Sequence, residues 1–295
     1  MPLAALGALL VVAVLWGSAF PAIKIGLEGF SVPHLTVGRH LVASLAFVAF
    51  LALTRSRLAP RLRDVPYFLL LGFLGIFTYH TALNAGEVRV SAGATSLIIA
   101  AAPAITALLA HAMLGQRMTR FGWLGSATSF AGVALIALGD AAGLRFDPFA
   151  AFILLAATST SFYFVLQQRM FATYRPLEVT AFVTWGGTVP MLAFLPGFPG
   201  AVQAVPTDAL LATIYIGVFP SAVAYSLFTF AQSRAPITLV TTLLYSVPVF
   251  SLTLSWWILG EVPSLLTLVG GVVVILGIVV VQRARRVALA RSAAS

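Results

Sequence analysis

Polar side chains inside long apolar runs are the residues of this sequence that could do chemistry. Tyr79, His80 and Asn84 fall within one such run, and Ser18 follows Trp16 in the first apolar run of the chain. Polar groups are costly in hydrocarbon, so residues of this kind usually face a partner helix or a solute. A histidine can donate to a carboxylate or titrate near neutral pH. These residues therefore indicate a binding site for a small amphipathic molecule.

An internal duplication extends this set to the second half of the chain. Matching residues recur at a constant offset of 145 positions, from Gly72 and Gly217 to Gly132 and Gly277. A fixed offset of half the chain length is typical of a duplicated fold. The predicted substrate contacts are aromatic or weakly polar: Trp16, Ser18, Tyr79, His80, Asn84, Tyr163, Trp185, Tyr225 and Tyr245. Such a lining suits an aromatic or mostly apolar solute that carries a few hydrogen-bonding groups.

Each of these residues also has a simpler interpretation. A single aromatic side chain can belong to a membrane-interface belt or to ordinary helix packing. His80 can be a neutral histidine that is bonded to a neighbouring helix. The set as a whole favours a binding site more than any one member does.

Proline and glycine recur at matched positions inside the apolar runs. Proline removes a backbone hydrogen bond and glycine weakens its turn, so a helix can bend at either residue. The candidate hinge residues are Gly72, Gly75 and Pro103 in the first half and Gly217, Pro220 and Pro248 in the second. Matched soft points are expected of two repeats that rock against each other, although each can also be a static kink that improves packing.

The composition places the chain in a lipid bilayer. It is 60% hydrophobic and 8% charged, with a mean hydropathy of +1.03, whereas ordinary soluble domains are roughly 25% charged. The lack of cysteine excludes disulfides and thiolate metal sites, and the common nucleotide-binding and hydrolase motifs are missing. We therefore expect a bilayer and a small molecule as partners, and no nucleic acid, cofactor, metal or enzymatic activity.

Ten apolar runs of about 20 residues are long enough to cross a bilayer as helices. They lie near 3–23, 32–54, 66–86, 91–114, 120–139, 148–168, 177–195, 208–230, 236–259 and 264–282. The predicted fold is an all-α polytopic membrane protein of two five-helix repeats, at 1–140 and 146–282, with a basic tail at 283–295. Because five is odd, the second repeat is inverted, and inverted repeats often hold a solute at their interface.

Positive charge is unevenly divided between the two ends of the predicted bundle. Thirteen Lys or Arg residues fall on the side of the tail, against Lys24, Arg39, Arg89 and Arg145 on the other side. By the positive-inside rule the first side is cytoplasmic, so both termini face the cytoplasm. No Asp or Glu lies in the middle of a span. That absence favours uniport, or weak proton coupling through His80, over sodium coupling.

Glycines seven residues apart form a smooth stripe on each of two spans. Gly125 and Gly132 lie in the fifth span, and Gly270 and Gly277 lie in the tenth. Small residues let helix backbones approach closely in lipid. We expect these spans to pack on each other within one chain or across a homodimer, so monomer and homodimer both stay open.

Short motifs link the sequence to a known family. Residues 15–20 read LWGSAF, Arg39 opens the second span, and Pro248 precedes 259–261, which read LGE. Through these motifs nearly the whole chain resembles the EamA-type branch of the drug/metabolite transporter superfamily, although Gln116 stands where the family often has glutamate. The resemblance is strongest to bacterial exporters of aromatic amino acids, and it implies a ten-helix basket with a central hydrophobic cavity.

The resulting prediction is a secondary transporter of the bacterial inner membrane that works by alternating access. The resemblance implies export of aromatic and other apolar amino acids through an aromatic-lined cavity. Another small metabolite or a drug is the alternative substrate. A channel, a non-transporting membrane subunit and an intramembrane enzyme are the alternatives from other classes.

Overall fold

The computed structural model describes residues 3–114, 118–139, 147–234 and 244–294, and these residues contain helices and no strands. The first half holds α1 (Leu3–Gly29), α2 (Val32–Leu53), α3 (Val65–Gly72), α4 (Tyr79–Glu87), α5 (Ala92–Ile99), α6 (Ala102–Leu114) and α7 (Arg120–Gly139). The second half holds α8 (Phe149–Leu166), α9 (Pro176–Met191), α10 (Phe198–Ala204), α11 (Thr207–Ile216), α12 (Tyr225–Arg234), α14 (Val247–Leu259) and α15 (Leu265–Ala294). Shorter segments are η1 (Leu62–Asp64), η2 (Phe73–Thr78), η3 (Gln167–Ala172), η4 (Leu192–Phe194), η5 (Gly217–Ala224) and η6 (Leu244–Ser246).

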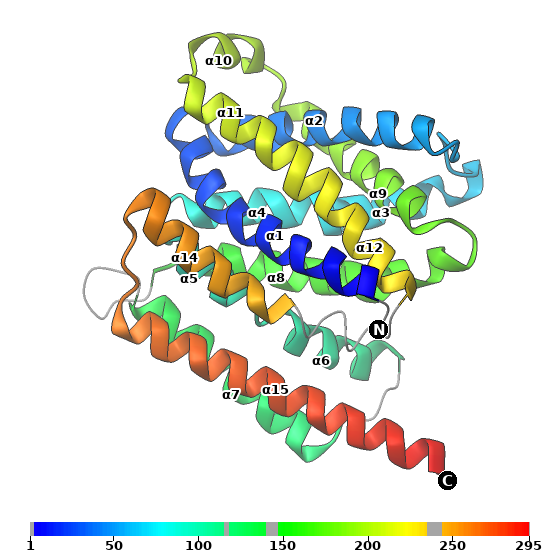
Figure 1. Ribbon diagram of the computed structural model, residues 1–295, viewed down its shortest axis with the longest axis vertical. Helices are drawn as coiled ribbons and strands as arrows, with labels where there is room; N and C mark the ends of the chain where they lie inside the picture. The colour runs from blue at the N-terminus through cyan, green and yellow to red at the C-terminus, as the bar shows by residue number, and fades with distance from the viewer. Residues whose placement is uncertain (1–2, 115–117, 140–146, 235–243, 295) are drawn as a thin grey trace.

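Long apolar helices confirm the predicted fold class. Within the described residues, nine helices are long and apolar enough to cross a bilayer, and the shorter α14 lies in the one remaining predicted span, 236–259. The start of the predicted span 236–259 lies outside the described residues. Leu45 and Trp257 are 72% and 77% exposed on outer faces, as suits side chains that meet lipid. Both termini lie at the same end of the helices (Figure 1).

The helix boundaries repeat at the offset found in the sequence. Shifted by that offset, α6 coincides with α14 residue for residue, and α15 begins where α7 begins. The segments η2 and η5 coincide to within one residue. The duplication in the sequence is therefore a duplication of structure.

The predicted soft points of the third and eighth spans are π-helical segments. Gly72 directly precedes η2 and Gly75 lies inside it, while Gly217 begins η5 and Pro220 lies inside it. Segments of π-helix are rare and are frequent at functional sites, because the wider turn displaces backbone carbonyls. The bend expected at these residues takes the form of a wide turn at the same place in both repeats.

The fourth predicted span is broken into α5 and α6 at residues 100–101. Pro103, in the first turn of α6, has no N–H to continue the backbone ladder across the break. Pro248 takes the same place in the first turn of α14. The hydroxyl of Ser161 on α8 donates to the carbonyl of Ala102 at 3.0 Å, which ties the start of α6 to the second repeat.

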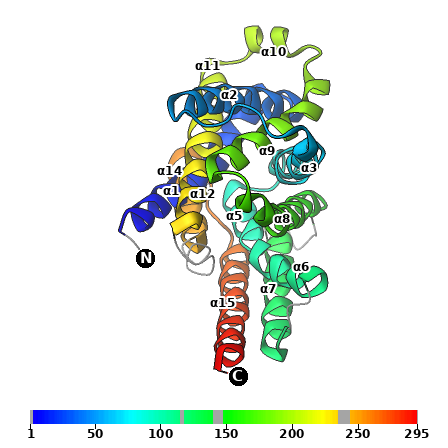
Figure 2. The ribbon, with the colours of Figure 1, turned by 90° about the vertical axis from the view of Figure 1, so that its right-hand side faces the viewer.

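The glycine stripes of α7 and α15 face each other, and the two helices run side by side in both views (Figures 1 and 2). A Cβ added at Gly132 would lie 2.6 Å from the amide nitrogen of Val274, and one at Gly277 would lie 2.5 Å from the carbonyl oxygen of Gly125. The predicted packing of these two spans is therefore confirmed within one chain.

Replacing Gly132 with valine should destabilise the protein, because the backbone of α15 cannot move out of the way as a flexible side chain could. Overpacking of this kind costs typically about 1–3 kcal/mol. Thermal unfolding of the purified protein in detergent measures the effect. Gly7→Val on α1 is the matched control, since an added Cβ there meets nothing within 4 Å. Equal melting temperatures of the two variants would contradict the contact between α7 and α15.

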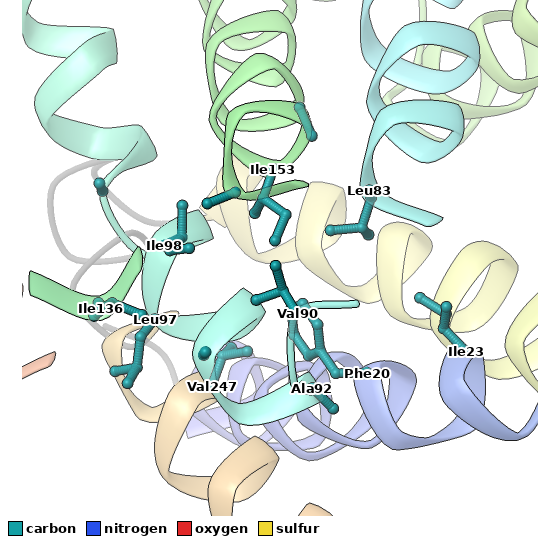
Figure 3. Packing of buried hydrophobic residues seen from close by; sticks show 14 of the residues in the cluster. Phe20, Ile23, Leu83, Val90, Ala92, Leu97, Ile98, Ile136, Ile153 and Val247 are labelled. Atoms are coloured by element: carbon teal, nitrogen blue, oxygen red, sulfur yellow. The ribbon is translucent and has the colours of Figure 1, made fainter. Parts of the chain in front are cut away.

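One buried apolar cluster joins the two repeats. Figure 3 shows Phe20 of α1, Leu83 of α4 and Ile98 of α5 gathered with Ile153 of α8 and Val247 of α14. All five side chains are buried. Their contact fixes the helices of the first repeat against those of the second, close to the polar residues of the third span.

Polar contacts hold the connection between α2 and α3 against the start of α9. The Glu178 carboxylate accepts hydrogen bonds from the amides of Arg57 at 3.0 Å and Arg175 at 2.9 Å. The hydroxyl of Tyr174 donates to Asp64 at 2.6 Å. Burial, with this hydrogen bond, raises the pKa of Tyr174 above its ordinary value, so the phenol keeps the proton that it donates.

Candidate functional site

Five rings from four helices meet where the two repeats join. The ring centroid of Trp16 on α1 lies 5.1 Å from that of Tyr225 on α12. His80 on α4 lies 4.6 Å from Tyr79 and 6.5 Å from Tyr225. His40 on α2 adds a second imidazole, 4.4 Å from His80. We call these five residues the ring cluster, and four of them are predicted substrate contacts.

Backbone carbonyls of the π-helical segments accept hydrogen bonds from helices that are equivalent in the two repeats. The indole N–H of Trp16 on α1 donates to the carbonyl of Pro220 in η5 at 3.1 Å. The hydroxyl of Ser159 on α8 donates to the carbonyl of Leu74 in η2 at 2.7 Å. Each wide turn is thus held by a side chain from the other repeat, and one of these side chains belongs to the ring cluster.

Asn84 lies one turn along α4 from His80 and is fully buried. Its amide nitrogen donates to the hydroxyl oxygen of Thr36 on α2 at 2.8 Å. The backbone carbonyl of Thr36 in turn lies 2.8 Å from Nδ1 of His40. Because a carbonyl can only accept, His40 carries its proton on Nδ1. Hydrogen bonds between α2 and α4 therefore link Asn84 through Thr36 to His40 of the ring cluster.

Arg39 is a functional candidate that the sequence interpretation missed. The sequence interpretation has Arg39 open the second span, which is wrong, because it lies two turns inside α2 and is only 3% exposed. Its Nε–H donates to the hydroxyl of Ser221 in η5 at 2.7 Å. The predicted span 32–54 already contained the signal, since it puts Arg39 at its eighth residue.

The ring cluster and its neighbours Arg39 and Asn84 contain several buried polar atoms that have no hydrogen-bond partner among the described residues. They are both ring nitrogens of His80, Nε2 of His40, Nη1 of Arg39 and Oδ1 of Asn84. Buried polar atoms are nearly always bonded, because an unpaired one costs free energy. Donors and acceptors gathered in this way can bind a polar group of a solute.

Glu87 shows that a carboxylate is buried close to the site, although none lies in the middle of a span. It ends α4, it is fully buried, and neither oxygen has a hydrogen-bond partner among the described residues. Lys24 on α1 and Glu261 before α15 act on it electrostatically. Glu261 also accepts a hydrogen bond from the amide of Ala92 at the start of α5, at 3.0 Å. Acidic and basic groups therefore meet at the end of α4.

The remaining predicted contacts lie around the ring cluster. Tyr163 on α8 is buried with its ring against Gly75, and Ser18 lies 2.6 Å from the hydroxyl of Tyr215. Trp185 packs on Phe182 with its N–H 3.2 Å from the carbonyl of Ser44, and Tyr245 bonds to Gln282 on α15. These residues pack or form hydrogen bonds next to the ring cluster and are not among its members.

Two candidate hinge glycines are places where helix backbones touch. A Cβ at Gly72 would lie 2.2 Å from the amide nitrogen of Gly187 on α9. A Cβ at Gly217 would lie 2.7 Å from the carbonyl oxygen of Arg39 and 2.7 Å from Cβ of Val42. These contacts are equivalent in the two repeats and leave no room for a side chain at either position.

The side chains at the site can bind a solute through apolar faces and polar atoms. In the described part of the chain, no group of three His, Cys, Asp or Glu residues could hold a metal ion. The ring cluster offers apolar faces, while Arg39, His80 and Asn84 offer donors and an acceptor. This pairing suits a molecule with one aromatic or apolar end and one charged end.

Sequence comparisons decide the family. The profile of the EamA-like transporter family matches residues 3–138 and again residues 148–283. The chain belongs to the EamA-like transporter family. It is therefore a multi-pass membrane transporter of the drug/metabolite transporter superfamily, with one family unit in each half.

Relatives of this EamA-like transporter are similar over most of their length. The uncharacterized transporter YdfC of Bacillus subtilis is 41% identical over 264 residues, which cover 90% of this chain and 86% of the relative. A probable terminal-alkyne amino-acid exporter of Streptantibioticus cattleyicolor is 39% identical over 279 residues, 95% of this chain and 93% of the relative. A crystal structure aligns with 99% of each chain at a TM-score of 0.64 and 20% identity, a likeness that concerns the fold alone.

Proposed function

We propose that this EamA-like transporter exports amino acids with large apolar side chains, aromatic ones above all. The observation that carries the proposal is the ring cluster, in which aromatic faces surround imidazole nitrogens without partners. The rings suit an apolar side chain, and His80 with Asn84 suits the charged end of an amino acid. The relative described as a probable terminal-alkyne amino-acid exporter supports amino acids as the class of cargo.

The proposed mechanism is alternating access between the two repeats. The π-helical segments are the elements that change shape, because a wide turn can exchange its backbone bonds at low cost. Gly72 and Gly217 are the points where helices roll on each other, and Gly75, Pro220, Pro103 and Pro248 weaken the backbone beside them. Ser18, Tyr163, Trp185 and Tyr245 border the path on either side of the ring cluster.

The proposed setting is the bacterial inner membrane, with both termini in the cytoplasm. The excess of Lys and Arg on the side of the tail supports this orientation. In it, the ring cluster takes up an amino acid from the cytoplasmic side. The amino acid leaves past the Glu87 end of α4.

Uptake of radiolabelled phenylalanine into proteoliposomes tests the proposal. We expect saturable uptake that an excess of unlabelled tryptophan, tyrosine or leucine reduces, since these share the apolar side chain. Aspartate and lysine should compete poorly, because a second charge would be desolvated among the rings. Protein that is folded but carries none of the apolar amino acids would refute the proposed cargo while leaving the family assignment intact.

An amino acid with a narrower apolar side chain is the second candidate cargo, and the description of the Streptantibioticus relative favours it. Propargylglycine, an amino acid with a terminal alkyne, is the probe for it. Competition by propargylglycine that exceeds competition by tryptophan would favour this candidate over an aromatic cargo.

Energy coupling is proposed to be uniport or weak proton coupling through His80. An imposed sodium gradient should leave the rate of phenylalanine uptake unchanged, because no carboxylate sits in the middle of a described span to bind the ion. Uptake that follows the sodium gradient would contradict this coupling.

A further inference from the structure

Arg39 is the only lysine or arginine in the described part of the chain whose side chain is buried. A guanidinium stays charged under all ordinary conditions, and here one nitrogen, Nε, is bonded to a neutral hydroxyl of Ser221. Nη1 is buried without a partner. A buried charge without a hydrogen-bonded counter-charge is costly, so the position suits an anionic group that arrives with the cargo.

The buried acids of the described residues do not supply that counter-charge. Glu178 is occupied by the amides of Arg57 and Arg175 at the far end of the bundle. Glu87 acts on Arg39 only through its field, and its oxygens make no hydrogen bond to any described residue. Nor does Arg39 form an ion pair within the described ranges. Nη1 of the guanidinium therefore remains available to donate a charge-assisted hydrogen bond to a carboxylate.

The hydrogen bonds around Asn84 determine which end of its amide is free. The hydroxyl of Thr36 donates its only proton to the carbonyl of Val32 at 2.7 Å. Toward Asn84 the Thr36 oxygen can therefore only accept, at 2.8 Å, so the amide nitrogen of Asn84 points at it. Oδ1 is left buried without a partner, as an acceptor that suits an ammonium group.

We propose that Arg39 binds the carboxylate of the transported molecule and Asn84 binds its ammonium group, so that the cargo must be a zwitterionic α-amino acid. Arg39 lies three residues beyond Thr36, an axial rise of about 4.5 Å along α2, so Arg39 and the residue that holds Asn84 are on neighbouring turns of one helix. Tyr79 and Tyr225 lie within electrostatic reach of Arg39, which puts rings beside the place of the side chain. This inference rests on the proposed function and adds the charges that the cargo must carry.

Competition in proteoliposomes tests the requirement for both charges without any mutation. Uptake of radiolabelled phenylalanine is measured against unlabelled phenylalanine, phenylethylamine, which lacks the carboxylate, and 3-phenylpropionate, which lacks the ammonium. Each analogue should compete about 10-fold to 100-fold more weakly than phenylalanine, the range expected for one lost charge-assisted bond. If either analogue competes as well as phenylalanine, the zwitterion requirement is overturned while the proposed function stands. If phenylalanine itself is not carried, both fall.

Substitutions assign each charge to its residue. Arg39→Gln should weaken phenylalanine uptake by the same factor and leave competition by phenylethylamine unchanged, because that analogue never used the guanidinium. Arg39→Lys keeps the charge without the planar fork and should give an intermediate loss, which covers the case in which Arg39→Gln does not fold. Asn84→Ala should weaken the uptake of phenylalanine and leave competition by 3-phenylpropionate unchanged, because that analogue has no ammonium group. Arg89→Gln, at an exposed position, is the control; a variant of Arg39 that weakens both analogues equally would overturn the assignment.

Discussion

Replacing His80 with alanine should lower the rate of phenylalanine transport by about 10-fold to 100-fold. His80 is central to the ring cluster, with His40, Tyr79 and Tyr225 around it. A hydrogen bond to a charged group contributes about 1.5–3 kcal/mol, and each 1.4 kcal/mol is about a tenfold change. Initial rates of phenylalanine uptake at low concentration in proteoliposomes measure this loss.

The same variant should remain folded, because His80 makes no hydrogen bond to any described residue whose loss would strand a partner. Size-exclusion chromatography and thermal unfolding in detergent check this point. His34→Ala is the matched control: it is also a histidine of the membrane domain, but it lies near the surface with Nε2 3.2 Å from the carbonyl of Pro196. Unchanged transport by His80→Ala would remove His80 from the site.

Replacing Gly217 with valine should abolish transport and lower stability together. The new Cβ would meet the carbonyl of Arg39 and the Cβ of Val42 at 2.7 Å each, so α2 must move away from η5. Overpacking costs about 1–3 kcal/mol, and the same shift breaks the alignment of Arg39 with Ser221. Thermal unfolding and phenylalanine uptake measure the two effects on one preparation.

Gly200→Val on α10 is the control for this substitution. Gly200 is exposed, and a Cβ there meets nothing within 4 Å, so this variant should transport and unfold like the original protein. Gly217→Val protein that transports normally would mean that η5 does not press on α2 during the cycle, and the proposed rolling contact would then be wrong.

The repeat offset and the glycine stripes were the parts of the fold that the sequence could predict. A duplicated sequence must give duplicated helices, and α6 and α14 coincide at the offset for that reason. The facing glycines Gly132 and Gly277 predict the contact of α7 with α15 because only small residues let backbones touch. Both predictions depend on residue patterns that can be read directly from the sequence.

The depth of Arg39 and the form of the bends could not be predicted in the same way. A charge near the start of an apolar run is ordinarily a boundary, and only the packing of η5 on α2 shows that Arg39 is enclosed. The carbonyl of Pro220 in η5 accepts a hydrogen bond from Trp16, which is distant from it in sequence. Proline and glycine indicate a bend there without indicating which bend.

Membership of the ring cluster could be predicted only in part. Trp16, Tyr79, His80 and Tyr225 share one contact region, whereas Trp185, chosen by the same repeat argument, packs against Phe182. The offset pairs residues that are equivalent in the two repeats, but it does not state which helix faces meet. The offset of 145 pairs Trp185 with His40, and of these two residues it is His40 that lies in the ring cluster.

Anomalous diffraction from crystals grown with 4-bromophenylalanine tests the central claim most directly, because the bromine marks where the aromatic end of the cargo lies. We predict a bromine peak beside Trp16 and Tyr225, with the amino acid backbone directed toward Arg39 and Asn84. A bromine peak away from the ring cluster would contradict the proposal that these rings bind the aromatic end of the cargo.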